Sequence, residues 1–224
     1  ETFDERGHAR RVWPETRWYR QNGEQKKNAA VLRLIEGDCV LNIMCGKLIR
    51  RALIEREHIR LVSGVKMAED ALFNLETVLC ARNIAYVHHV AYRYRIHSAS
   101  ATGSRRNSEW EAHLPWLVAM RNMLARRGEL ERYYAPLLNS FALRLYKDGG
   151  IGGVVREFNT KVKPYLALDG LTRAKMTPYG RVVWALCRRG RYPTAYPLIA
   201  VVQMMKRKCG EAAFALRAER EKPQ

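Results

Sequence analysis

The spacing of hydrophobic and polar residues predicts helices alternating with short strands up to about residue 100, and helices alone after it. Apolar residues recur at helical intervals at Leu72, Leu75, Val78 and Leu79. The predicted helices span 24–35, 47–58, 68–81, 109–126, 130–147, 179–188 and 194–208. The predicted extended segments are short apolar runs at 39–44, 59–65, 84–87 and 90–96. Alternating strands and helices are typical of an α/β fold, so we expect an α/β domain followed by a mainly helical region.

A stretch of small residues, 98–104, separates these two patterns and places the predicted domain boundary. We therefore expect one domain over 1–103 and a helical, basic region over 104–224. A chain of 224 residues is long enough to bury a substantial core. The chain begins with Glu1 inside a polar, arginine-rich stretch, and we interpret it as a fragment or a processed form.

The charge of the chain is high and unevenly distributed. The formal net charge is +18, although the hydrophobic content of 47% is ordinary for a folded protein. Residues 171–224 hold twelve Lys or Arg against three Glu, a net of +9. Such an excess attracts polyanions, anionic lipid surfaces or phosphorylated ligands.

The cysteines and the apolar segments narrow the class of protein further. Five widely spaced cysteines form no Cys-x-x-Cys pair, which argues against a disulfide scaffold or a zinc ribbon and favours a reducing compartment, the cytoplasm. The most apolar segment, 195–205, has about 11 residues, whereas crossing a bilayer takes roughly 20. The sequence therefore predicts no membrane-spanning segment.

Two adjacent acids, Glu69 and Asp70, begin the helix predicted at 68–81. One explanation is structural, because acids in a first turn face the positive end of the helix dipole. The other is functional, because a carboxylate here could take a proton from a hydroxyl group as that group attacks an electrophile. Neighbouring residues on a helix point about 100° apart, so only one acid would face a substrate and the other would support it.

Cationic residues precede and follow this acidic pair. Lys47 lies upstream, and Arg93, Arg95 and His97 lie downstream in a predicted strand. Alternate residues of a strand share a face, so these three donors would line up and suit the oxygens of a diphosphate. An edge strand with a solvated charged face would show the same pattern.

The order of these segments resembles the second half of the family-2 glycosyltransferases with the GT-A fold. The sequence runs from Gly46-Lys47-Leu48 through Glu69-Asp70 and Phe73 to Tyr92-Arg93-Tyr94-Arg95-Ile96-His97 and Ser100. The resemblance covers about residues 25–102. It implies that 1–103 is the acceptor-side half of a Rossmann-like domain that transfers a sugar from a nucleotide-sugar donor to a glycan or lipid-linked acceptor, with inversion.

Carried over residue by residue, the resemblance gives Asp70 the role of catalytic base, with Glu69 as its partner. Lys47 matches the lysine of the family's Asn-Lys-Leu segment, and Tyr94, Arg95 and Ser100 match the Tyr-x-Tyr-Arg segment. Lys47, Arg93, Arg95 and His97 become candidates for binding the donor diphosphate. Relatives usually have Trp-Asn before this lysine, whereas this chain has Cys45-Gly46.

The family's N-terminal half is missing from the sequence. Its Pro-x-Tyr-Asn strand and its Asp-x-Asp motif, which binds a divalent metal and the nucleotide diphosphate, do not occur. We expect the donor-binding half to precede Glu1 and the metal, Mg or Mn, to bind there, with no metal site in this chain. Alone, the chain should bind donor weakly and catalyse little.

The basic C-terminal part leaves two further hypotheses open. Cationic clusters flank the apolar stretch within 188–208, a pattern typical of segments that lie on an anionic bilayer, here the inner face of the cell membrane. A packed helix with solvated ends would look the same. A basic helical module that binds nucleic acid is the other alternative to an enzyme, but the basic residues match no recognised nucleic-acid-binding pattern.

Overall fold

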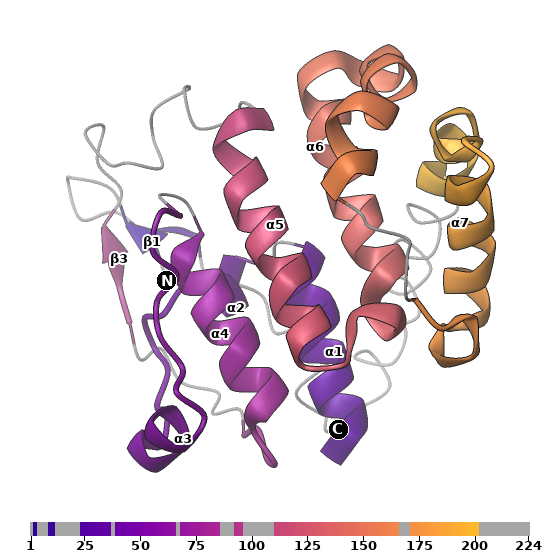
Figure 1. Cartoon of the computed structure of the whole chain (residues 1–224). Coiled ribbons are helices and arrows are strands. Elements are labelled where there is room, and N and C mark those ends of the chain that lie inside the picture. Colours follow the sequence, from indigo (N-terminus) through magenta and orange to yellow (C-terminus); the bar gives the residue numbers. More distant parts are fainter. Residues whose placement is uncertain are drawn as a thin grey trace, which may run out of the picture.

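The computed structural model describes residues 2–3, 9–11, 23–36, 39–65, 68–85, 92–95, 110–165 and 171–201. Within these ranges the chain is mainly helical (Figure 1). The α-helices are α1 (Gly23–Glu36), α2 (Cys39–Asn42), α3 (Arg51–Arg56), α4 (Glu69–Cys80), α5 (Trp110–Arg126), α6 (Leu130–Glu157) and α7 (Pro178–Arg188). A π-helical turn, η4 (Phe158–Val162), and the 3₁₀ turns η5 (Lys163–Tyr165) and η6 (Arg173–Lys175) link α6 to α7, and residues 192–201 are helical again.

The strands in the described ranges are only two or three residues long. They are β1 (Thr2–Phe3), β2 (Ala9–Arg11) and β3 (Tyr94–Arg95), in the order β2-β1-β3. β1 runs antiparallel to β2 and parallel to β3, with Thr2 opposite Tyr94. These strands lie at one edge of the molecule, away from α7 (Figure 1).

The predicted α/β fold, the acceptor-side half of a GT-A domain, is therefore wrong for the described residues. Residues 39–42 of the expected 39–44 strand are the helix α2, and 59–65 form an extended and turning connection outside any sheet. The misassignment has a physical cause: a short apolar run buries equally well as a strand or as a turn of helix, and periodicity cannot separate the two. Of the strands expected at 84–87 and 90–96, residues 86–91 and 96 lie outside the described ranges, and only Tyr94–Arg95 pair.

The longer helices were predicted more accurately. α1, α4, α5 and α7 match the predictions within a few residues, whereas α3 covers only part of 47–58. α6 continues ten residues beyond the predicted end at 147, through a kink at Gly150, whose φ of 61° is left-handed. Of the helix predicted at 194–208, residues 202–208 lie outside the described ranges.

The core forms where α1, α4, α5 and α6 meet. The Gly128 turn, with a φ of 71°, joins α5 to α6, and these two helices pack against each other. α4 packs on α1, α2, α3 and α5, and every residue from Ala71 to Thr77 is buried. Buried residues from both sides of the predicted boundary at residue 104 belong to one cluster. The boundary itself lies outside the described residues and stays a prediction.

Candidate functional site

The acidic pair lies at the N-terminus of α4, in the first turn of a helix whose residues 71–77 are all buried. Glu69 and Asp70 are its first two residues, and the Asp70 Oδ1 accepts a hydrogen bond of 2.8 Å from the Ala71 amide. The preceding residue, Ala68, has a left-handed φ of 60° and makes no side-chain cap. Left-handed backbone is unfavourable for a non-glycine residue by about 1 kcal/mol or more. Such strain is concentrated at functional sites in other proteins, which draws attention to this helix start.

Asp70 lies in an environment that changes its basicity. Burial raises the pKa of the Asp70 carboxyl above its ordinary value, the bond from Ala71 lowers it, the Glu69 charge raises it and the Lys47 charge lowers it. The net shift is upward because desolvation of the charged form is the largest effect. Asp70 is therefore a stronger base than an exposed aspartate.

A tight turn brings Lys47 close enough to act on Asp70. Gly46 has a left-handed φ of 72°, a conformation that glycine adopts without strain and that asparagine tolerates better than most residues. The Lys47 ammonium donates a hydrogen bond to the carbonyl oxygen of Ile43, four residues back, which folds its side chain over the turn.

Asn74 connects this turn segment to the acidic helix. Its side chain is only 2% exposed, and its amide nitrogen lies 2.8, 3.1 and 3.0 Å from the carbonyl oxygens of Leu41, Asn42 and Ile43. Asn74 lies one helical turn after Asp70. It therefore fixes the segment that carries Lys47 relative to the helix that carries Asp70.

The Tyr92–Arg95 segment approaches the same turn. A Cβ atom built on Gly46 would lie 3.7 Å from the Cβ of Tyr92, so the two backbones are in close proximity. The structure thus brings Lys47, the acidic pair and Tyr92 into one neighbourhood. Arg93 is exposed. The side chain of Arg95, and His97 and Ser100 entirely, lie outside the described part of the chain, so the predicted row of diphosphate donors stays a prediction.

A second polar cluster anchors the other end of α4. Glu76, 4% exposed, accepts bonds of 2.6 Å from Arg126 and 2.9 Å from Arg127. Arg127 also reaches Glu57 at 3.2 Å. These ion pairs fix α4 to the end of α5 and to the segment after α3. Neither this cluster nor the role of Asn74 was predicted from the sequence. The one signal that could have indicated them is a polar residue among the apolar positions of a predicted core helix.

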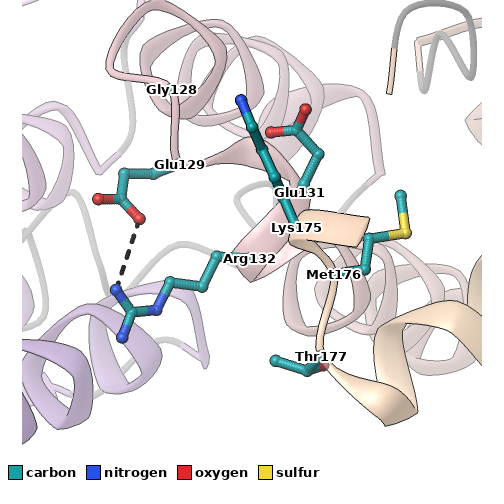
Figure 2. A pocket seen from close by; sticks show the side chains of 7 residues that line it. All are labelled: Gly128, Glu129, Glu131, Arg132, Lys175, Met176 and Thr177. Atoms are coloured by element: carbon teal, nitrogen blue, oxygen red, sulfur yellow. Dashed lines mark ion pairs between the residues drawn. The ribbon is translucent and has the colours of Figure 1, made fainter. Parts of the chain in front are cut away.

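The hollow drawn in Figure 2 is separate from this neighbourhood. It measures about 460 Å³ and lies between the α5–α6 turn and the start of α7. Its lining residues are Gly128, Glu129, Glu131, Arg132, Lys175, Met176 and Thr177. Arg132 pairs with Glu129 at 3.9 Å and with Glu24 at 3.0 Å, so its charge is satisfied within the protein.

Metal binding finds no support in the described ranges. They contain no group of three or more His, Cys, Asp or Glu side chains placed to hold an ion. Within the same ranges no helix combines the length and apolar character that crossing a bilayer requires.

Comparison with known proteins assigns no family to the chain. No family model matches the sequence, and no curated protein and no solved structure does so either.

Proposed function

We propose that the chain contributes the acceptor-activating part of an inverting glycosyltransferase, with Asp70 as the general base. The observation that carries the proposal is the half-buried carboxylate of raised pKa beside the Lys47 turn. The order of motifs, which resembles that of the family-2 glycosyltransferases, supplies the reaction class. The helical architecture lends no support of its own, so the proposal rests on the site.

In the proposed reaction Asp70 removes the proton from a hydroxyl group of the acceptor, a glycan or a lipid-linked sugar. The resulting oxygen attacks the anomeric carbon of a nucleotide-sugar, and the nucleoside diphosphate leaves from the opposite side. The new bond has inverted configuration, and the proton stays on Asp70 until it passes to solvent. Burial makes Asp70 the better base, while the Lys47 charge favours the ionised form that the reaction needs.

The remaining candidates take supporting roles. Glu69 raises the pKa of Asp70 through its charge. In the proposed reaction it would accept a hydrogen bond from an acceptor hydroxyl. Arg93, Arg95 and His97 would donate to the diphosphate, a group that guanidinium side chains bind bidentately. We propose a cytoplasmic location because Cys45, Cys80 and Cys187 carry free thiols, which are usual in a reducing compartment.

The proposal requires parts that these residues do not supply. A nucleotide-binding half and the ligands of a divalent metal must come from elsewhere, since the sequence contains no Asp-x-Asp. The reading frame upstream of Glu1 is therefore the first test. A Pro-x-Tyr-Asn strand and an Asp-x-Asp encoded there would support the proposal, and a frame without them would contradict it.

The kinetic test uses the full natural protein and the substitution Asp70→Asn. A well-placed general base contributes roughly 10²–10⁴-fold, so turnover should fall by about that factor with donor binding nearly unchanged. Glu55→Gln on α3, which neutralises an exposed acid, is the matched control and should retain activity. Near-normal turnover in the Asp70 variant would exclude the proposed role.

A further inference from the structure

The segment 171–201 has a one-sided charge. It contains no Asp or Glu, and its six basic side chains are all exposed: Arg173, Lys175, Arg181, Arg188, Arg189 and Arg191. Elsewhere in the described chain many arginines face acids, as Arg126 and Arg127 do. The excess charge here is compensated by no acid of its own segment, so it is available to an anionic partner.

The helix α7 carries its basic side chains on the side that faces away from the core. Val183 and Cys187 are buried against the interior, whereas Arg181, Arg188 and Val182 are exposed, the last at 59%. At 100° per residue these exposed positions share the side opposite the buried pair. The Arg188 guanidinium lies 4.8 Å from the centre of the half-buried Trp184 ring. α7 thus presents cations around an apolar position.

The following helix adds exposed apolar side chains. Leu198 is 70% exposed and Val201 41% exposed, and both lie on the same side of the 192–201 helix as Thr194. The opposite side holds Tyr192 and Tyr196, which are buried. The segment therefore combines two exposed aliphatic side chains with basic side chains that no acid of the segment neutralises.

We propose that segment 171–201 is a docking surface for an anionic lipid bilayer. Arginines on the exposed side of α7 would bind lipid phosphates and carboxylates, and Leu198 and Val201 would enter the interfacial region. Basic charge flanking apolar side chains is complementary to that surface. α7 lies at the edge of the molecule opposite α3 and β3, so a planar surface can reach it (Figure 1). The inference does not depend on the proposed sugar transfer.

A nucleic acid fits the same segment less well. Single strands bind to exposed aromatic rings on which bases stack. Here the Tyr192 ring packs on Phe158 with 4.7 Å between ring centres, and Tyr196 is buried beside it. Exposed aliphatic side chains give a base no stacking surface, whereas lipid accepts them.

The test measures sedimentation of the purified 224-residue chain with vesicles of equal parts phosphatidylcholine and phosphatidylserine. Each arginine near such a surface contributes about fivefold in binding, so Arg181→Ala/Arg188→Ala/Arg189→Ala should weaken it on the order of a hundredfold. The matched control, Arg51→Ala/Arg56→Ala/Arg60→Ala, removes the same charge from exposed positions around α3 and should lose much less.

The apolar contribution is tested with Leu198→Ser/Val201→Ser. This variant keeps the charge, and we expect it to lose about tenfold in binding, because interfacial binding scales with inserted apolar area. Circular dichroism establishes that each variant is folded. Three results would each overturn the proposal. They are equal losses of binding in the two arginine variants, equal binding of the wild type to pure phosphatidylcholine, and tighter binding to an RNA oligonucleotide that only the α7 variant loses.

Discussion

The sharpest test of the site architecture is the substitution Asn74→Asp. The two side chains are nearly the same size, so the change replaces one amide group by a carboxylate oxygen and leaves the packing of α4 intact. In the protein that amide lies within 2.8–3.1 Å of three backbone carbonyl oxygens. The variant would place a negatively charged carboxylate oxygen against these three carbonyl oxygens, which are also hydrogen-bond acceptors.

The magnitude follows from the bonds that are lost. The amide has two N–H groups, each worth about 1 kcal/mol net, and the buried carbonyls left without a donor add further desolvation, so we expect about 3 kcal/mol of destabilisation. In urea, with a slope of 2–3 kcal/mol per M, the unfolding midpoint should fall by roughly 1 M.

The effect should also depend on pH. Burial among carbonyl oxygens raises the pKa of the new carboxyl, and a protonated carboxyl can donate one hydrogen bond. The folded variant therefore binds a proton more tightly than the unfolded chain, and the destabilisation should shrink as the pH falls toward about 4 and below. Urea titrations followed by far-ultraviolet circular dichroism at neutral and acidic pH measure both effects.

The control is Asn122→Asp, at an exposed asparagine whose side-chain oxygen accepts from Arg121. A carboxylate accepts that bond equally well, so the control should stay within about 0.5 kcal/mol of the wild type. If Asn74→Asp behaved like the control at neutral pH, Asn74 could not be what connects the Lys47 turn to the acidic helix.

Four further substitutions and one labelling experiment test other parts of the structure. Burial raises the pKa of the Asp70 carboxyl above its unfolded value near 3.8, so the protonated carboxyl stabilises the fold below that pH and this stabilisation is lost as the pH rises. Asp70→Asn should therefore increase the unfolding free energy at neutral pH but not in acid, and an equal gain at both pH values would contradict this. Tyr192→Phe removes a buried bond of 2.7 Å to Asn139 and should lower stability by about 1–2 kcal/mol in urea titrations, whereas an unchanged midpoint would speak against that bond. Burial raises the pKa of the Cys187 thiol to about 12, so iodoacetamide should label it only after unfolding, as mass spectrometry would show. Gly46→Ala should destabilise the turn by about 1 kcal/mol and Gly46→Asn by less, and equal thermal stability of both would rule out a left-handed residue here.

The longer helices were predictable because their apolar residues recur at helical intervals. α4 also begins where its acidic pair suggested. The α2 segment was not predictable, since four or five apolar residues carry no period. The extension of α6 was missed for another reason: its residues 149–153 include four glycines, which argue against helix locally. The backbone does leave helical geometry at Gly150, but the helix resumes after this kink and continues to Glu157.

The site was predictable only as a list of residues. The motif order suggested that Lys47 and Asp70 act together, and the Lys47 charge does reach Asp70. The connection between them was invisible, because Asn74 contacts carbonyl groups more than thirty positions earlier in the chain. Backbone acceptors have no sequence signature, so only the folded arrangement reveals which polar residue holds them.

The continuity of the core has a practical consequence for handling this protein in pieces. α4 and α5 pack together across the stretch between residues 80 and 110, and α1 packs on α6. A cut within that stretch would leave each fragment with an uncovered apolar face whose complement is on the other fragment. The two fragments would have to be produced in the same cell and would be recovered together, as a complex of two chains.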